Sequence, residues 1–496
     1  MATLAAVDLG AQSGRVAVGR FDGGRLSVTE VHRFPNVPVR TRGTLSWDIL
    51  RLYQDVLDGL RAAAREAGRV DSIAVDSWAV DFGLIDRTGR LLRNPVHYRD
   101  GRRAGSMERV LERVPARELY ERTGIQLLPI NTVFELGAMA VEGDPVLEAA
   151  ETMLLIPDLV NYWLCGARTT ELTNATTTQL FDPFAGEWAD DLLERAEIPA
   201  RLFPEVVPPA SVLGAVCAEP AEETGLASAR VIASATHDTA SAVAAVPFRR
   251  PGSVFLSVGT WSLVGVEVPA PVVTDETFAA NLTNEGGVAG TFRLLRNVTG
   301  LWLLHECRRR FAELGRDYTF EQLVALAEDA APLRSLVDPD DPSFAEPGDM
   351  PERIAAFCRA TGQPVPAEPG DVARCIVDSL ALKHAETIDL LREAAGADPA
   401  ELHVVGGGAR NALLCAATAD AAELPVLAGP EEATLIGNLL VQAMALGELS
   451  SLEELRDVVR ASFAQTVYEP TPSNRWREAR ARFAGLRRDA NVRVSA

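Results

Sequence analysis

Two hydrophobic periodicities alternate along the first 70 residues. Apolar and polar residues alternate over residues 15–21 and again over residues 26–34, and the turn sequence Asp22-Gly23-Gly24 separates the two runs. Alternation with a period of two predicts β-strands, so we expect a meander that begins with the apolar strand ending near Asp8. Residues 47–67 instead repeat their apolar positions every three to four residues, which predicts an amphipathic helix. Strands followed by a helix indicate an α/β layer.

The same pattern starts again after Gly252. Residues 254–258 are apolar, Gly259-Thr260 makes a small polar turn, and residues 261–268 alternate. Strand, polar turn and strand repeat the order of the N-terminus, although few letters are shared. Further helices are predicted over residues 132–142, 158–164, 372–395 and 476–488, and a strand over residues 401–405.

The length of the chain favours more than one domain. It has 496 residues, of which 47% are hydrophobic and 24% charged, which is too long for one hydrophobic core. We expect an N-terminal domain over residues 1–245, a C-terminal domain over residues 246–465 and a helical tail over residues 466–496. The two domains are expected to be related and to meet at a cleft.

Charge and cysteine usage exclude several function classes. The net charge is −21 and Lys383 is the single lysine, so a basic surface for nucleic acid is not expected. No basic and apolar leader and no apolar run of about 18 residues is visible, so a membrane partner is not expected. The six cysteines lack metal-ligand spacing, which argues against a zinc site. We expect a cytoplasmic protein that is a monomer or a small homo-oligomer.

A candidate phosphate site lies at the first turn. The segment Asp8-Leu-Gly-Ala-Gln-Ser-Gly-Arg15 places a carboxylate at the end of an apolar strand, directly before a glycine-bearing turn. Glycine lets backbone N–H groups approach phosphate oxygens, Gln12 and Ser13 can add donors, and Arg15 can neutralise charge. Asp8 can hold a hydrated Mg²⁺. A P-loop would continue into a helix, whereas this turn continues into a strand. A plain hairpin is the alternative interpretation.

A candidate catalytic base lies at Asp238. The segment Ala235-Thr-His-Asp-Thr-Ala-Ser-Ala242 follows a predicted strand over residues 230–234 and precedes a predicted helix. Phosphoryl transfer to an alcohol needs a group that accepts the hydroxyl proton, and a carboxylate can do this. The alternative is that Thr236 or Asp238 caps the helix, and the two roles can coexist.

Five segments together resemble the FGGY family of carbohydrate kinases. They are residues 8–15, 76–82, 236–239, 257–262 and 406–408, within a resemblance that runs in one order from about residue 4 to about residue 470. The resemblance implies an α/β fold of two duplicated actin-like, ribonuclease H-like domains of the hexokinase/Hsp70/actin superfamily, with an interdomain cleft. It also implies a sugar kinase that uses ATP and Mg²⁺. Within the family, the chain is most similar to kinases that convert the ketose L-rhamnulose to L-rhamnulose 1-phosphate.

The resemblance implies a role for each matching position. The metal would lie near Asp8, and Asp238 would deprotonate the hydroxyl on carbon 1 of the sugar. The residues that would contact ATP come from four segments and are Ala11, Gln12, Ser13, Gly14, Arg15, Gly259, Thr260, His305, Gly406 and Gly407. The residues that would contact the sugar are Trp78, Ala79, His237, Asp238, Thr239 and Asn297.

Two positions depart from the family pattern. Ala79 stands where the family usually has glycine, and its methyl group could crowd the sugar, so another ketose such as L-fuculose or a pentulose is the alternative substrate. His305 stands where a nucleotide-contacting glutamine is expected. Imidazole titrates near neutral pH, so ATP affinity is expected to depend on pH. A non-kinase ATPase or a sugar-binding protein of the same fold is the third hypothesis.

Several of these residues also have an ordinary structural interpretation. Trp78 either stacks on the sugar or belongs to the core, and Phe82 is expected in the core. His237 and Asn297 can simply brace their neighbours. The charged residues Arg99, Asp100, Arg102 and Arg103 are interpreted as a solvated face and are left out of the predicted site.

Overall fold

The computed structural model describes residues 2–103, 105–250, 252–471 and 473–494, so residues 472, 495 and 496 of the predicted tail lie outside it. The chain divides into two compact units, each made of three separate stretches. The first unit holds Met1–Pro247, Glu267–Leu294 and Glu432–Ala464. The second holds Phe248–Val266, Leu295–Glu431 and Gln465–Ala496.

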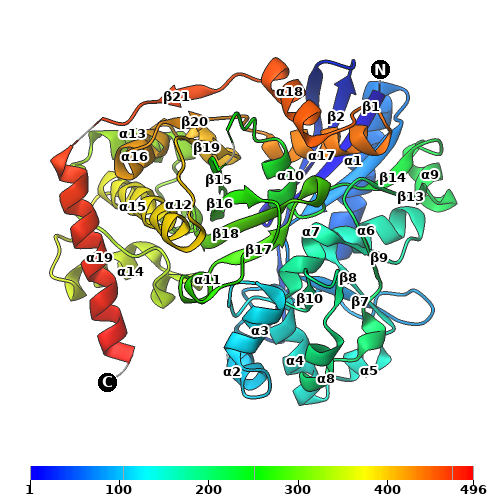
Figure 1. The fold of residues 1–496 in the computed structure, drawn as a ribbon, viewed down its shortest axis with the longest axis horizontal. Coiled ribbons are helices and arrows are strands. Elements are labelled where there is room, and N and C mark those ends of the chain that lie inside the picture. The colour runs from blue at the N-terminus through cyan, green and yellow to red at the C-terminus, as the bar shows by residue number, and fades with distance from the viewer. Residues whose placement is uncertain (1, 104, 251, 472, 495–496) are drawn as a thin grey trace. The chain divides into compact units, whose positions relative to one another are not determined.

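The first unit is built on a six-stranded sheet with the order β13-β14-β6-β1-β2-β3 (Figure 1). The strands are β13 (Ser211–Ala215), β14 (Arg230–Ala233), β6 (Ser72–Ser77), β1 (Ala2–Leu9), β2 (Ser13–Phe21) and β3 (Leu26–Pro35). The predicted meander is confirmed, because β1, β2 and β3 pair antiparallel in turn. β6 pairs parallel with both β1 and β14. The carboxyl ends of these three parallel strands therefore meet at one edge of the sheet.

The helix α1 (Ile49–Ala67) covers this sheet and matches the predicted helix within two residues. Its apolar stripe of Leu52, Val56 and Leu60 is buried, and the helix ends at Gly68, whose φ of 72° favours glycine. Trp47, which was expected to begin the helix, instead lies before it and is fully buried. A buried indole needs a partner for its N–H, and the partner belongs to the site described below.

Two helices of the first unit approach each other closely at a glycine. They are α10 (Asp238–Ala244) and α17 (Ala433–Ala445), and they meet at Gly437. A Cβ atom at Gly437 would lie 1.8 Å from the carbonyl oxygen of Ser241, so the contact is possible only for glycine. α17 therefore fixes the position of the helix that begins at Asp238.

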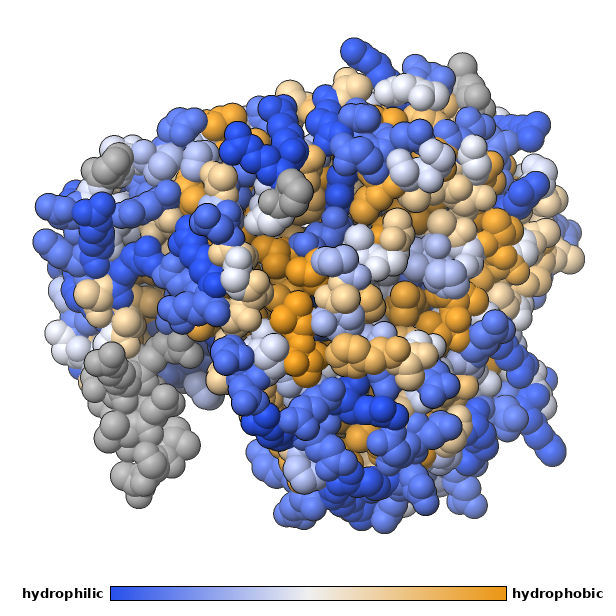
Figure 2. Space-filling view, viewed as in Figure 1, coloured by the Kyte–Doolittle hydropathy of each residue, from blue (hydrophilic) through white to orange (hydrophobic). Residues whose placement is uncertain are grey.

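A smaller layer of the same unit surrounds the hairpin of β7 (Phe82–Ile85) and β8 (Thr152–Leu155). Its core contains Phe82, as predicted, together with Phe134 and Leu155. Hydrophilic residues cover the face over α2, α3 and α8 in Figure 2. The helices of this layer are α2 (Ser106–Leu111), α3 (Ala116–Thr123), α4 (Thr132–Glu142), α5 (Pro145–Ala149), α6 (Ile156–Cys165), α7 (Leu172–Ala175) and α8 (Asp190–Arg195), and its strand β9 covers Thr169–Glu171.

The second sheet has seven strands in the order β17-β18-β16-β15-β19-β20-β21. The strands are β15 (Val254–Val258), β16 (Trp261–Val268), β17 (Thr283–Gly286), β18 (Phe292–Thr299), β19 (Leu402–Val405), β20 (Val426–Ala428) and β21 (Thr466–Tyr468). β15 and β16 match their predicted bounds and pair antiparallel, as β1 and β2 do. The strand, turn and strand order is thus repeated.

The helices of the second unit are α12 (Trp302–Glu313), α13 (Phe320–Asp329), α14 (Met350–Ala360), α15 (Pro369–Ala395), α16 (Ala412–Ala422) and α19 (Asn474–Val494). Within the described ranges, no helix combines the length and the apolar character needed to cross a bilayer.

Candidate active site

Three carboxylates gather where the parallel strands of the first sheet end. Asp8 on β1 and Asp76 on β6 are register partners. Ser77 bridges to His237, and its N–H donates to the carbonyl of Thr236 at 2.9 Å. This pairing places Asp238, the next residue, at the same edge. The sequence predicted a chemical role for Asp8 and Asp238. Asp76 was included only as the first residue of the segment 76–82, with no role of its own.

The pKa values of Asp76 and Asp238 are both raised at this edge of the sheet. Asp76 is fully buried, and burial followed by the nearby charge of Asp8 raises its pKa well above the usual range. Burial and Asp8 also raise the pKa of Asp238, while His237 acts in the opposite direction. Asp76 Oδ2 accepts from Asn438 Nδ2 at 2.5 Å, but Asp76 Oδ1 is buried without a hydrogen-bond partner. Clustered carboxylates with an unsatisfied oxygen suit a bound cation.

Arg15 already contacts one of these acids. Its Nε and Nη2 donate to Asp8 Oδ2 at 2.8 and 2.7 Å, and it also forms an ion pair with Glu432 at the start of α17. Both bonds to Asp8 use the same oxygen. These two acids raise the pKa of Arg15 against the opposing effect of burial. The arginine is therefore a fixed positive charge beside Asp8, held from two directions.

The first turn is braced by a residue that the sequence analysis missed. Asn36 Nδ2 donates to the carbonyl of Gly10 at 3.0 Å, and its N–H donates to the carbonyl of Gln12 at 2.9 Å. Ala11 and Ser13 are half-buried in this turn and Gln12 is exposed. Gly14 is buried, and a Cβ there would lie 2.3 Å from the Phe34 ring. Packing against Phe34 thus explains why residue 14 carries no side chain.

The Trp78–Val80 loop carries a strained residue. Val80 has φ of 66°, which is a genuine outlier for a β-branched side chain, and its carbonyl accepts from Thr132 Oγ1 at 2.7 Å. Ala79 is half-buried and is not among the left-handed residues, so replacing glycine with alanine needs no unusual backbone there. Trp78 is 7% exposed and its ring lies 4.3 Å from that of Trp47, centroid to centroid. The position of Trp78 is consistent with the interpretation that it is a core aromatic residue.

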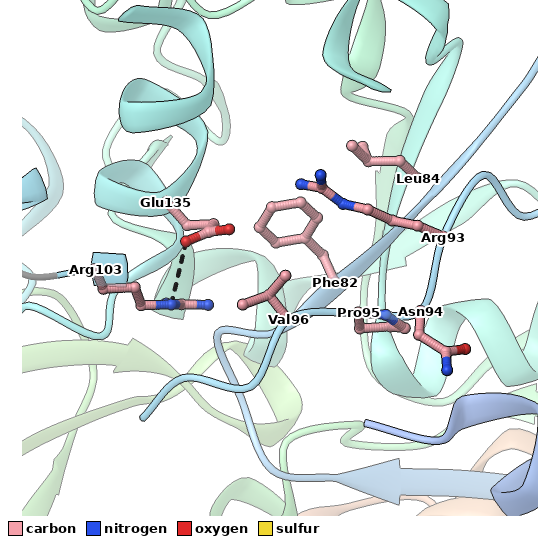
Figure 3. Close-up of a pocket in the computed structure, with 8 residues that line it drawn as sticks. All are labelled: Phe82, Leu84, Arg93, Asn94, Pro95, Val96, Arg103 and Glu135. Carbon is pink, nitrogen blue, oxygen red and sulfur yellow. Dashed lines mark ion pairs between the residues drawn. The ribbon is translucent and has the colours of Figure 1, made fainter. Parts of the chain in front are cut away.

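Asp81 stabilises this loop by accepting hydrogen bonds from three side chains. Its Oδ2 accepts from Trp47 Nε1 at 2.6 Å and from Trp78 Nε1 at 3.1 Å, and its Oδ1 accepts from Arg103 Nη2 at 3.1 Å. Burial raises the pKa of Asp81 to about 6 against these favourable contacts. Arg103 also forms an ion pair with Glu135, with 3.2 Å between Nε and Oε2, and the two side chains lie side by side in the lining of a small pocket (Figure 3).

The prediction of a solvated charged face is therefore wrong for two of its residues. Arg103 is 6% exposed and Asp100 is 4% exposed. Asp100 Oδ2 accepts from the N–H of Leu45 at 2.5 Å. Each of the two charges has its partner in a distant part of the chain, so the local sequence gives no sign of burial.

The segment before Asp238 is anchored by Glu171, which the sequence analysis also missed. Glu171 is fully buried at the end of β9 and accepts from both the N–H and the hydroxyl of Thr236 at 2.9 Å. His237 occupies the N-cap position of α10 without a side-chain cap bond, so neither Thr236 nor Asp238 is the cap residue. Asp238 is 32% exposed and accepts from Thr239 Oγ1 at 3.0 Å. Its carboxylate is thus accessible rather than consumed by capping.

Each glycine of the triplet that follows β19 has its own physical explanation. Gly406 has φ of 77°, and a Cβ at Gly408 would lie 2.3 Å from Val258. Gly407 is exposed, and a Cβ there would meet nothing within 4 Å. Only Gly407 therefore faces open space, as a ligand position should.

The second predicted phosphate turn is held by the start of α12. The carbonyl of Gly259 accepts from the N–H of Leu301 at 2.9 Å, and the carbonyl of Thr260 accepts from the N–H of Gly300 at 3.1 Å. Asn297 lies half-buried on β18 in the same unit. The predicted site residues are thus divided, with Asp8, residues 11–15, Trp78, Ala79 and residues 237–239 in the first unit, and Gly259, Thr260, Asn297, His305, Gly406 and Gly407 in the second.

The expectation that His305 titrates near neutral pH is wrong. Burial, and then the charge of Arg308, lower its pKa from 6.5 to about 4. The imidazole ring packs against the Phe320 ring in a T-shaped arrangement, with 4.5 Å between the ring centroids. A neutral imidazole still offers one donor and one acceptor.

We therefore predict that His305 adds no pH dependence to nucleotide binding. Because its folded pKa lies near 4, the ring is neutral at every pH from 6 to 8. The ratio of ADP dissociation constants for the wild type and His305→Gln, measured by calorimetry, should stay constant over that range. A ratio that changes by more than about threefold between pH 8 and pH 6 would mean that the ring gains a proton there.

The carboxylates at this edge of the sheet are compatible with Mg²⁺ that is also bound by water and phosphate. They do not form a site in which protein side chains alone would hold a metal. Among the residues that the structure describes, no three or more His, Cys, Asp or Glu side chains are arranged to hold a metal ion. Mg²⁺ keeps several waters and binds through one or two carboxylates together with phosphates. Asp8 and the unsatisfied Oδ1 of Asp76 fit that requirement.

Comparison with known proteins agrees with this geometry. Residues 3–245 match a family model described as the N-terminal domain of the FGGY family of carbohydrate kinases, and residues 254–446 match the C-terminal domain of that family. The chain is 43% identical over 478 residues to a rhamnulokinase of Bacteroides thetaiotaomicron, covering 96% of this chain and 98% of that protein. It is 40% identical over 463 residues to a rhamnulokinase of Oceanobacillus iheyensis, covering 93% and 97%.

Solved structures share the fold at much lower identity. A xylulose kinase from Rhodospirillum rubrum has a TM-score of 0.79 at 22% identity and covers 100% of both chains. A ligand-bound xylulose kinase from Lactobacillus acidophilus also has a TM-score of 0.79, at 16% identity, covering 99% of this chain and 98% of that one. The predicted fold class is confirmed by these neighbours. At such identities they say nothing about the sugar.

Proposed function

The chain belongs to the FGGY family of carbohydrate kinases, and we propose that it transfers the γ-phosphate of ATP to the 1-hydroxyl of L-rhamnulose, giving L-rhamnulose 1-phosphate and ADP. Two relatives named rhamnulokinase, each matched over nearly its whole length, support this sugar over L-fuculose or a pentulose. The observation that carries the chemistry is the accessible carboxylate of Asp238, at the sheet edge that also holds Asp8 and Asp76.

We assign Asp238 the role of the base. Phosphoryl transfer depends on positioning and charge stabilisation, and the protein must also accept the proton of the attacking hydroxyl. Burial and the neighbouring charge of Asp8 raise the pKa of Asp238, which makes its carboxylate a better proton acceptor.

The other predicted residues are assigned to ATP, to Mg²⁺ and to the sugar. Asp8 and Asp76 would hold Mg²⁺, which neutralises charge on the transferred phosphoryl group when bound. Arg15 and the turn of residues 11–14 would contact phosphate, and so would Gly259 and Thr260. Trp78, Ala79, His237, Thr239 and Asn297 would contact the sugar, and His305, Gly406 and Gly407 the nucleotide.

Replacement of Gly407 by alanine tests the adenosine assignment. The added methyl group meets no protein atom, so the melting temperature should stay within about 2 °C of the wild type. If the nucleotide lies against this glycine, the dissociation constant for ADP should rise by at least about tenfold, because the methyl group displaces it. Gly485→Ala is the matched control, since a Cβ there also meets nothing within 4 Å. Equal ADP affinity in the two variants would remove Gly407 from the site.

A panel of ketoses tests the function itself. Purified protein is mixed with ATP and Mg²⁺, and ADP release is followed with L-rhamnulose, L-fuculose, L-ribulose and D-xylulose. The proposal requires L-rhamnulose to give the highest kcat/KM by at least about tenfold. A stronger preference for another ketose would replace the substrate, and ADP release that no sugar accelerates would contradict kinase activity.

A further inference from the structure

His237 stands beside an arginine and between two acidic side chains, all in the first unit. Its Nε2 lies 3.5 Å from Asp238 Oδ1, and its Nδ1 lies 3.1 Å from Arg293 Nη2 and 3.4 Å from Glu285 Oε2. Arg293 Nη1 lies 3.1 Å from the same Glu285 oxygen, and its Nε donates to the carbonyl of Gly286 at 3.0 Å. Arg293 has no exposed surface. The guanidinium is therefore fixed against the imidazole.

The chemistry of the guanidinium decides which ring nitrogen of His237 carries the proton. Arginine only donates hydrogen bonds, so a contact of 3.1 Å between Arg293 and Nδ1 requires Nδ1 to accept. If Nδ1 carried a hydrogen, two N–H groups would point at each other. A doubly protonated ring would also place a second positive charge beside the guanidinium. The single ring proton then belongs on Nε2, which is the nitrogen that faces Asp238.

We infer that Arg293 is a positioning residue that holds His237 as the neutral Nε2–H tautomer and thereby directs this N–H toward the carboxylate of Asp238. An N–H directed at a carboxylate favours its ionised form and limits its rotation. With the other tautomer, the Nε2 lone pair would face the carboxylate oxygen and repel it. Glu285 balances the charge of Arg293 in the buried network. The assignment of Asp238 as the base rests on the proposed function, whereas the tautomer of His237 does not.

The tautomer can be measured without any substrate. Protein labelled with ¹⁵N in its six histidines is examined by NMR at pH 7, and His237→Gln identifies the signals of this ring. We expect a pyridine-type shift for Nδ1 and a pyrrole-type shift for Nε2. An Nδ1–H tautomer or an imidazolium in the wild type would overturn the inference whatever sugar the enzyme uses.

Two variants of one ion pair separate positioning from structural support. In Arg293→Gln, Glu285 at 3.4 Å becomes the nearest strong acceptor for Nδ1, so the tautomer should reverse. Turnover should fall about 10- to 100-fold, as for residues that orient an active group through one intermediary, with KM for ATP changed by less than about threefold. In Glu285→Gln, Arg293 remains, so the wild-type tautomer should persist with a loss at least about tenfold smaller.

Arg293→Lys keeps the test decisive if Arg293→Gln fails to fold. An ammonium group also only donates, so the lysine variant should keep the wild-type tautomer and recover part of the turnover. Equal losses of turnover in both glutamine variants with an unchanged tautomer would show that the pair only supports the fold. The expected tautomer in a protein that phosphorylates no ketose would instead contradict the proposed function and leave the assignment of the ring proton intact.

Discussion

Asp238→Asn is expected to lower kcat with L-rhamnulose by about 10²–10⁴-fold, the range for loss of a general base. Asparagine preserves the shape of the side chain and can still accept from Thr239 Oγ1, but it cannot accept the hydroxyl proton. Dissociation constants for ADP and for the sugar should therefore change by less than about threefold. Initial rates and calorimetry on the same preparations measure both quantities.

Asp190→Asn is the matched control for this variant. Asp190 is also the first residue of a short helix, α8, but it is exposed. Its replacement reproduces the loss of one acid from a first helical turn, so kcat should stay within about twofold of the wild type. Wild-type turnover in Asp238→Asn would remove Asp238 as the base and leave it as a structural residue of α10.

Asp81→Ala is expected to lower the free energy of unfolding by about 3–5 kcal/mol, as for the loss of one partner of a buried ion pair. The change leaves the buried guanidinium of Arg103 without one counter-charge and the indole N–H groups of Trp47 and Trp78 without their acceptor. Because the Trp78–Val80 loop depends on these contacts, KM for the sugar should also rise. Urea unfolding followed by tryptophan fluorescence measures the stability change.

Asp55→Ala provides the comparison for this stability change. Asp55 is buried to nearly the same degree, but its partner Arg51 has a side chain that is 67% exposed. Removing Asp55 leaves an arginine that water can solvate, so the loss should stay below about 1 kcal/mol. An equal loss of unfolding free energy in the two variants would show that the burial of Arg103 does not explain the effect of removing Asp81.

The local sequence predicted the strands and the main helix because their signals are periodic. Alternation identified β2, and the three-to-four repeat identified α1. The strand β13 was not predicted. It lies at the edge of the sheet, pairs only with β14 across a register shift, and is largely half-exposed, so it has no alternating core face to detect.

Site residues were predicted where chemistry coincides with the end of a strand, as at Asp8 and before Asp238. The missed residues act through partners that are distant in sequence. Arg103 contacts Asp81 at a separation of 22 residues, and Arg293 contacts His237 at a separation of 56. A buried arginine and a solvated one look the same in a sequence, because the difference lies in the partner. The low pKa of His305 likewise depends on its burial and on Arg308.

The most direct test of the account is to identify the product. Wild-type protein and Asp238→Asn are incubated with ATP, Mg²⁺ and ¹³C-labelled L-rhamnulose, and the sugar is examined by ³¹P and ¹³C NMR. We predict a phosphate ester on carbon 1 with the wild type, and at most a trace of it with the variant over the same time. A phosphate on any other carbon, or ADP formed without a phosphorylated sugar, would contradict transfer to the 1-hydroxyl.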